Sequence, residues 1–329
     1  MGFIEHLTDM FSDFADPKKR VFVGYLGLSV LIAFLWLIAI KRQNIRTAFS
    51  KVFDGKVFFS GSAKADYKIF VINRIFTFFI SPLLATNIAI ATAIYFLLHG
   101  QDVIPAGMFL GANKALVVAL FTLTMFMIDD LTKYLVHRWM HHWPMLWTIH
   151  KVHHSAETLT PVTVYRVHPL EGVLYGLRSA VAQGFAISVF YFLFGNTVDL
   201  YTIVGVNVLV FLFHVTGSNL RHSHIDISYW PWLEYILISP AQHQLHHSIA
   251  EEHHDKNFGA ALAIWDWLFG SLHLSEKEKE LEFGLLPHEA SATNLVDIYT
   301  RPFIDMFKIA RRRWRKATGK ARQMLWPAE

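Results

Sequence analysis

The sequence contains no cysteine and few charged residues. None of its 329 residues is Cys, only 17% are Asp, Glu, Lys or Arg, and 53% are hydrophobic. The missing cysteine excludes disulfides, thiolate metal sites and cysteine nucleophiles, so any metal must be bound by nitrogen or oxygen. The mean hydropathy of +0.32 is typical of a multi-pass membrane protein with an aqueous part, not of a soluble domain.

Several widespread motifs are also missing. The chain has no G-x-G-x-x-G dinucleotide-binding pattern, no cytochrome-like segment and no H-E-x-x-H zinc-protease pattern. A net charge of +4 does not indicate nucleic-acid binding. Residues 1–19 lack a basic segment followed by a small-residue cleavage site, so we do not expect a cleavable signal peptide.

Long uncharged runs predict an all-α protein, a bundle of about four transmembrane helices. A run of about 20 apolar residues crosses the hydrocarbon core of a bilayer. Residues 3–16 are amphipathic and are expected to lie at the membrane interface, with a core-packed helix as the alternative. Residues 43–70 are expected to form a polar connection. The uncharged runs are 21–40, 75–98 with Pro82 inside it, 115–128, and the pair 179–198 and 200–213.

The C-terminal tail is strongly basic. Residues 301–322 hold nine Lys and Arg and one acid, Asp305, with aromatic and aliphatic residues between them. This pattern predicts a basic amphipathic helix at a cytoplasmic membrane face, with a calmodulin-type target or a solvated helix as alternatives. We therefore divide the chain into N-terminal membrane and interfacial helices (1–114), a catalytic domain (115–275) and a basic tail (276–329).

Histidines are concentrated in the middle of the chain. Of 19 histidines, 16 lie between His137 and His273, and most of these form three runs. The first run, 137–142, has the spacing H-x3-H-H, and the runs 150–154 and 243–247 have H-x2-H-H. Residues three or four apart share one face of a helix, so each run places imidazoles side by side. So many buried imidazoles without a common partner would be unsatisfied polar groups, and a metal site is the better interpretation.

The number of histidines indicates two metal ions. A structural zinc takes four ligands and a catalytic zinc takes three plus water, so eight imidazoles exceed the needs of one ion. All-nitrogen ligation suits iron, copper or zinc. A helix that continues from the run 115–128 through Asp130 and Tyr134 would lift His137 and His141 out of the bilayer, where the polar ligands can be satisfied.

Residues 115–275 resemble the fatty acid hydroxylase/sterol desaturase superfamily of integral-membrane di-iron enzymes. The three histidine runs match its histidine boxes in order, and Asp130 precedes the first box as an acid does in that family. Further similar stretches are 150–157 (HKVHHSAE), 165–171 (YRVHPLE), 217–222 (GSNLRH), 239–240 (SP), 255–259 (DKNFG) and 265–270 (WDWLFG). The resemblance implies a helical membrane bundle with a cytosolic, histidine-rich metal-binding cap.

The resemblance also implies the site residues. The expected metal ligands are His137, His141, His150, His153, His154, His243, His246 and His247. Additional candidate ligands are His142, His222, His224, His214 and His168, of which His168 could instead be a buried structural histidine next to Pro169. Asp130 is expected to accept a hydrogen bond from a ligand's other ring nitrogen. Glu157, Asn257 and Asp266 are expected to have the same supporting role.

The expected reaction is oxidation of a C–H bond in a membrane lipid such as a sterol, a fatty acyl chain or an alkylglycerol. Hydroxylation, desaturation and ether cleavage by hydroxylation remain open alternatives. The expected cofactors are two Fe ions, which zinc could replace in purified protein, and O2, with an external electron donor such as a redox protein or reduced pterin. The expected location is a membrane, preferably a bacterial inner membrane rather than the ER, with the metal site facing the cytoplasm. A membrane zinc-dependent lipid hydrolase and a metal-handling or transport protein are the competing functions.

Overall fold

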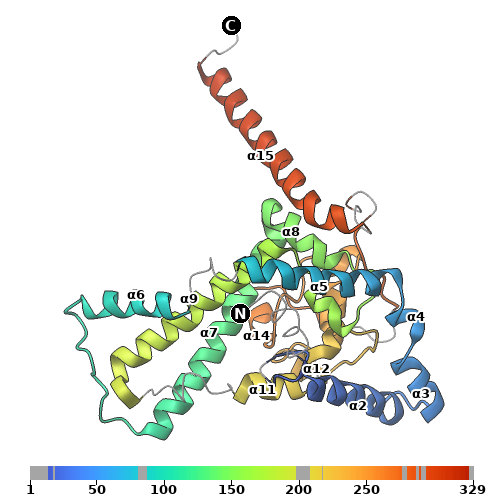
Figure 1. The fold of residues 1–329 in the computed structure, drawn as a ribbon, viewed down its shortest axis with the longest axis horizontal. Coiled ribbons are helices and arrows are strands. Elements are labelled where there is room, and N and C mark those ends of the chain that lie inside the picture. Colours follow the sequence, from blue (N-terminus) through green and yellow to red (C-terminus); the bar gives the residue numbers. More distant parts are fainter. Residues whose placement is uncertain are drawn as a thin grey trace.

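A computed structural model describes residues 14–17, 19–80, 87–197, 208–216, 218–275, 280–286, 289 and 294–325. Within these ranges the regular elements are helices, and the extended contacts are two isolated bridges, Leu237 with Leu262 and Ser248 with Phe283. The expected all-α class is therefore confirmed for the described residues. Figure 1 shows α6, α7 and α9 side by side, α8 and α5 above a group of short helices, and α15 projecting from the body.

The α-helices are α2 (Val23–Ala39), α3 (Ile45–Val52), α4 (Gly55–Phe58), α5 (Gly61–Ile80), α6 (Asn87–His99), α7 (Lys114–His142), α8 (Pro144–His154), α9 (Pro169–Phe194), α11 (Val208–Val215), α12 (Pro231–Glu234), α13 (Pro240–His246), α14 (Ile264–Leu268) and α15 (Leu295–Leu325). Short 3-10 helices connect them: η3 (Pro161–Tyr165), η4 (Gly195–Thr197), η5 (Ser218–His222) and η6 (Glu251–His253).

Within the described part of the chain, two helices are long and apolar enough to cross a membrane. They are α7 and the continuous segment Pro169–Thr197, which joins α9 to η4. Only 17% of the most apolar window of α7 is buried by the rest of the chain, so much of its surface is free to face lipid. Val23–Ala39 and Ala89–His99 are apolar but shorter. About four spans were expected, and residues 198–207, within the expected second hairpin, lie outside the described residues.

Local signals fix where the two long helices begin. Asn113 starts α7, because its side chain accepts hydrogen bonds from the backbone N–H groups of Ala115 and Leu116. His168 and Pro169 start α9 in the same way, with the His168 ring accepting from Leu170 N. α9 approaches α6 closely at Gly184, where a Cβ would lie 3.0 Å from the backbone nitrogen of Ala91. The lack of a side chain at Gly184 therefore allows this helix contact.

One residue separates α7 from α8. Trp143 ends α7 and precedes α8 with extended backbone angles, and Pro144 occupies the first position of α8. Proline is well suited to this position, because its fixed φ matches a helix and its missing N–H would have had no partner there. The chain therefore turns sharply after His142 and folds α8 back beside the end of α7, as the contacts between their histidines show.

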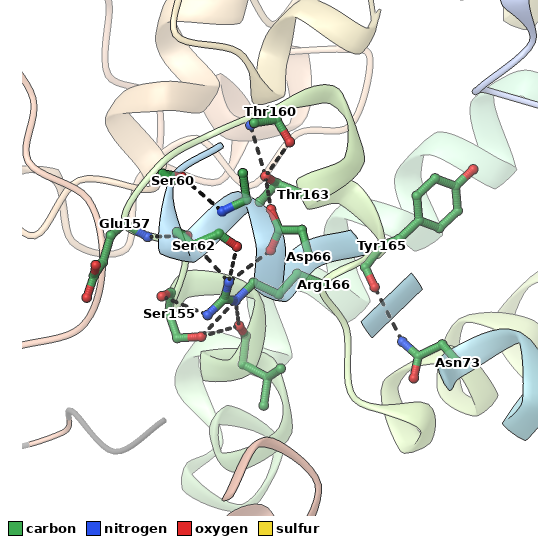
Figure 2. Close-up of polar contacts among 12 residues, drawn as sticks. Ser60, Ser62, Asp66, Asn73, Ser155, Glu157, Thr160, Thr163, Tyr165 and Arg166 are labelled. Atoms are coloured by element: carbon green, nitrogen blue, oxygen red, sulfur yellow. Dashed lines mark hydrogen bonds and ion pairs between the residues drawn. The ribbon is translucent and has the colours of Figure 1, made fainter. Parts of the chain in front are cut away.

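A buried polar network fastens the far end of α8 to α5 (Figure 2). Arg166, just after η3, forms a 2.8 Å ion pair with Asp66 of α5, and both side chains are almost completely buried. The Arg166 guanidinium also donates to Val152 O and to the hydroxyl and carbonyl oxygens of Ser155. Thr163 donates to the second oxygen of Asp66 at 2.6 Å. Since Val152 and Ser155 flank the pair 153–154, this network positions the second histidine run.

Three other expectations concern residues outside the long apolar helices. Residues 43–70 are not a simple polar connection but contain α3, α4 and the start of α5, because Asn44 and Asp54 cap α3 and α4 through Thr47 N and Lys56 N. The expected helical tail is confirmed as α15, which Lys151 of α8 anchors through a 2.7 Å ion pair with Asp305. The expected interfacial stretch 3–16 lies largely outside the described residues.

Candidate metal centre

The three histidine runs lie on three helices whose ends meet. The first run is the last turn and a half of α7, the second is the C-terminal half of α8, and the third lies in α13 and ends at His247, the residue after it. A capping box starts α13: Ser239 accepts from Gln242 N, and the Gln242 side chain accepts from Ser239 N. The predicted continuation of the helix is confirmed, since α7 carries Asp130, Tyr134 and His137 on its buried face.

The histidines form two groups, which we call cluster A and cluster B. Within each cluster one ring nitrogen from every member lies within 4.8 Å of the others. The clusters touch, because the rings of His154 and His247 stack with centroids 4.6 Å apart. Cluster A contains His137, His141, His150, His154 and His246, and cluster B contains His153, His222, His243 and His247.

The second and third histidine runs each contribute to both clusters. α8 gives His150 and His154 to cluster A and His153 to cluster B. Residues four apart lie on the same side of a helix, whereas neighbouring residues point about 100° apart. α13 divides its histidines in the same manner. Helical geometry therefore turns a consecutive pair of histidines into one ligand for each cluster.

In cluster A the outer ring nitrogens are held by hydrogen bonds. Nδ1 of His137 bonds to the carbonyl oxygen of Phe258 at 2.8 Å, Nδ1 of His246 to that of Lys256 at 2.7 Å, and Nδ1 of His150 to Oε1 of Glu171 at 3.0 Å. Each acceptor requires Nδ1 to carry the proton, which leaves the Nε2 lone pair free. Nε2 has no hydrogen-bond partner in His150 or His246. Such orphaned, inward-facing nitrogens fit a metal ion.

In cluster B the ring nitrogens face one another directly. Nε2 of His222 lies 3.1 Å from Nε2 of His153 and 3.0 Å from Nε2 of His243. Metal–imidazole bonds are about 2.0–2.1 Å long, so two nitrogens bound at right angles to one ion are about 3.0 Å apart. The observed spacing therefore fits three ligands of a single ion better than a chain of hydrogen bonds between neutral rings.

Burial favours the neutral form of histidines in both clusters. Burial, and then the neighbouring imidazoles, lower the pKa of His153, His154 and His222 well below its ordinary value. Burial also lowers the pKa of His246, to about 3. Neutral imidazole is the form that binds metal, so at neutral pH the two clusters offer lone pairs rather than positive charges.

The supporting acids contact the backbone rather than the rings. Asp130 was expected to accept from a histidine ring; instead it accepts from Ala261 N at 2.9 Å, Leu262 N at 3.0 Å and the indole of Trp265. Asp266 accepts from Phe258 N and Gly259 N at 2.8 and 2.7 Å, and burial raises its pKa to about 6. Both acids thus fix the loop that carries the Phe258 carbonyl, the partner of His137.

Two other expected supporting residues have different surroundings. Asn257 is buried with φ +55°, donates to Gln242 O and His273 O, and accepts from His273 N, so it shapes the loop after α13. Glu157 has an exposed side chain, and its backbone N–H donates to Ser62. Among the described residues, Glu171 is the carboxylate that hydrogen-bonds to a clustered histidine, while Asp255 Oδ1 lies 3.9 Å from Nδ1 of His141. Glu171 belongs to the 165–171 stretch of the sequence but was not assigned a role there.

Of the five additional candidate ligands, the structure brings only His222 into a cluster. His142 bonds to Arg138 O on its own helix, and His224 bonds to Lys51 O at 2.6 Å. His214 bonds to the hydroxyl of Ser218, and His168 caps α9 and contacts Tyr299 O. These four rings therefore have partners outside the clusters, and His168 has the structural role considered as its alternative.

A cavity of ≈ 400 Å³ lies on one side of the clusters. Histidines of both clusters, including His137 and His243, line its inner end, and α7, α9 and α11 supply apolar walls that include Phe126 and Phe213. A smaller cavity, lined by His141 and His247, lies beside the loop 284–286. The clusters can therefore be reached from both a helix-lined and a loop-lined side.

Comparison with known proteins agrees with this geometry. Residues 122–271 match the family model described as fatty acid hydroxylase, a range that contains both clusters. This part of the chain is similar to the fatty acid hydroxylase family. The matched fatty acid hydroxylase range begins in α7 and ends just after α14, so it includes every residue of clusters A and B. No solved structure matches the chain.

The relatives that the chain matches act on lipids, as their names state. The chain is 27% identical over 48% of its length to an ornithine lipid hydroxylase of Rhizobium tropici, covering 43% of that protein. It is 30% identical over 43% of its length to alkylglycerol monooxygenase of Danio rerio, covering 28% of it. It is 28% identical over 58% of its length to a Delta(7)-sterol 5(6)-desaturase of Eremothecium gossypii, covering 48% of it. The chain thus spans less than half the length of these relatives.

Proposed function

We propose that this protein is a membrane oxidoreductase that uses O2 and two iron ions to hydroxylate a C–H bond of a lipid. The observation that carries the proposal is the pair of adjoining clusters of buried, neutral imidazoles with inward-facing ring nitrogens. The lipid hydroxylase, monooxygenase and desaturase relatives support the reaction class. Desaturation differs only in the loss of a second hydrogen and belongs to the same proposal.

The clusters divide the metal-binding task. Cluster A would hold one ion through five imidazoles, and cluster B would hold the other through four. Bound iron would supply the activation of O2, because an unactivated C–H bond requires an oxidant that no side chain provides. In the overall reaction one oxygen atom enters the lipid as hydroxyl and the other leaves as water. An external donor supplies the two electrons and two protons that this balance needs.

The residues of the chain set the geometry of the reaction. Glu171 and the carbonyls of Phe258 and Lys256 fix the tautomer and the tilt of three cluster A rings, so that Nε2 is the free nitrogen. The apolar walls between α7, α9 and α11 would receive the lipid and exclude water from the reacting carbon. Exclusion of water also strengthens each charge interaction inside the cavity.

Membrane attachment is part of the same proposal. α7 and Pro169–Thr197 would cross the bilayer and end near the clusters, with the metal site on the cytoplasmic side. Exposed aromatic residues gather around α12: Trp230 and Trp232 stack on each other and are 68% and 63% exposed, and Trp267, 58% exposed, contacts Tyr235. Tryptophan is enriched at membrane interfaces, which supports placing this surface at the level of the lipid headgroups.

The first experiment would measure metal content and O2 uptake of protein purified after expression with excess iron. About two irons per chain, with O2 uptake that depends on a reductant and a membrane lipid extract, is the expected result. Zinc that stays bound under these conditions, without O2 uptake, would contradict the proposal and favour a zinc-dependent hydrolase. Metal transport by reconstituted protein without O2 uptake would favour a metal-handling protein.

The histidine runs contain matched controls for this experiment. We expect His141→Ala and His222→Ala each to lower the metal content toward about one ion per chain and to abolish lipid oxidation. His142 follows His141, and His224 is two residues after His222, but both lie outside the clusters. His142→Ala and His224→Ala should therefore keep the metal content and activity of the wild type. Equal loss in both pairs would contradict the assignment of the clusters.

A further inference from the structure

Two arginines line the helix-lined cavity, and neither forms an ion pair with a carboxylate of the described residues. Arg20 precedes α2, and Arg221 lies in η5 next to His222 of cluster B. Arg221 is only 7% exposed. A buried guanidinium that forms no direct ion pair is costly, so its place in a cavity requires an explanation.

The hydrogen bonds of Arg221 leave most of its donors unused. A guanidinium has five N–H donors, and Arg221 uses Nη1 to donate to Ala260 O. Its Nε is buried and has no hydrogen-bond partner. The guanidinium carbon lies 5.0 Å from the centre of the Phe213 ring, which also lines the cavity. Arg221 therefore has donors available at the boundary between the apolar wall and cluster B.

Arg20, which precedes α2, contacts the 3-10 helix that contains Arg221. Its Nε donates to the Asn219 side chain at 3.0 Å and its Nη2 donates to Ser218 O, both in this helix, η5. Burial, and then repulsion by Arg221, lower the pKa of Arg20 to about 9, so it remains charged at neutral pH. The two arginines are thus close enough to repel each other.

The acids of the cavity are already engaged by other groups. Asp129 forms ion pairs with Lys133 at 2.6 Å and with Arg178 at 2.9 Å. Asp130 accepts two backbone N–H groups and the Trp265 indole, and Glu171 accepts from His150. The charge of Asp130 acts favourably on Arg221, but among the described residues no carboxylate of the cavity forms an ion pair with either arginine, so a ligand anion could pair directly with both.

We propose that Arg20 and Arg221 bind an anionic phosphate or carboxylate at the head of the lipid substrate. Guanidinium groups bind these anions with paired, charge-assisted hydrogen bonds. The anion would also separate the two positive charges, and the apolar cavity wall would receive the adjoining chain. Because His153, His222 and His243 line the same cavity, the head group and the metal-binding imidazoles would share one space. This inference rests on the proposed function, since it names the substrate class for that site.

The test measures binding to the metal-free protein, so that it does not depend on oxidation. Lysophosphatidic acid and a monoacylglycerol with the same acyl chain differ only in the phosphate, and both would be titrated in detergent. We expect the phosphate lipid to bind at least tenfold more tightly to the wild type, a difference of about 1.4 kcal/mol. Arg20→Gln and Arg221→Gln should each remove most of this preference and leave monoacylglycerol binding unchanged.

Controls separate the head-group role from folding and from simple phosphate binding. Arg20→Lys and Arg221→Lys keep the charge and should keep part of the preference, while Arg46→Gln removes an exposed arginine of α3 and should keep all of it. Inorganic phosphate at the same concentration should compete weakly, because it lacks the chain.

Equal binding of the two lipids by the wild type would overturn the inference. So would an unchanged preference in both glutamine variants, or full competition by inorganic phosphate. These outcomes are distinct from failure of the proposed function. A protein that prefers lysophosphatidic acid but never consumes O2 would contradict the oxygenase and keep the head-group site. A protein that oxidises lipids without any preference for the anionic head group would contradict the head-group site and support the oxygenase.

Discussion

Replacement of Glu171 is the most direct test of how the site is built. Glu171 is 21 residues from His150 in the sequence, but its Oε1 accepts from His150 Nδ1 at 3.0 Å, and both side chains are 3% exposed. The other oxygen, Oε2, has no hydrogen-bond partner in the described residues. A buried carboxylate in this position is stabilised by a positive metal ion close to the ring it holds, so we expect Glu171 and the metal to stabilise each other.

The size of the effect follows from what each substitution removes. Loss of a group that holds a ligand's outer nitrogen lowers metal affinity by about 10–100-fold, or about 1.4–2.7 kcal/mol. Glu171→Gln keeps an acceptor oxygen but loses the charge, so the loss should be near the lower end. Glu171→Ala also removes the hydrogen bond from His150, so the loss should be near the upper end.

Competition with a chelator of known affinity would measure this change for iron and for zinc. Glu157→Gln is the matched control, because Glu157 has an exposed side chain and contacts no clustered histidine. It should bind metal as the wild type does. If Glu171→Ala binds metal as tightly as the wild type, or if Glu157→Gln weakens binding to the same extent, the reasoning that Glu171 orients His150 is wrong.

Two further predictions concern stability. Asp66→Ala would leave the Arg166 side chain, which is 2% exposed, without its ion-pair partner, and should cost about 3–5 kcal/mol in unfolding measurements in detergent. Breaking the more exposed Lys41–Asp226 pair by Lys41→Ala should cost under about 1 kcal/mol, and equal effects would argue against the network. The metal-free protein should also lose stability as pH falls. Burial lowers the pKa of His246 from 6.5 to about 3, so the unfolded chain takes up a proton that the folded chain refuses. The stability present above pH 6.5 is therefore lost progressively toward pH 3, by about 2 kcal/mol at pH 5 for this residue alone; a denaturant midpoint that does not change between pH 7.5 and 5 would contradict it.

Local sequence patterns determined much of this protein. The spacing of the histidine runs predicted helices with imidazoles on one face, and α7, α8 and α13 carry them as expected. All eight ligands that the family resemblance implied lie in the two clusters, but the spacing within a run determines only which imidazoles share a face of one helix. The prediction of residues 43–70 as a polar connection was wrong, because hydrophilic composition alone does not exclude short, capped helices.

The partition of the site was decided by tertiary structure. The sequence could not show that His153 and His154 belong to different clusters, since this depends on how α8 is rotated against α7 and α13. Nor could it separate His222 from His224, two residues apart: the packing of η5 against α13 brings His222 to His243, while His224 turns toward Lys51. Likewise, Glu171 rather than Glu157 reaches a histidine because α9 begins beside α8. Local spacing decides which imidazoles share a helix face, but only the packing of helices distant in sequence decides which nitrogens share a metal ion.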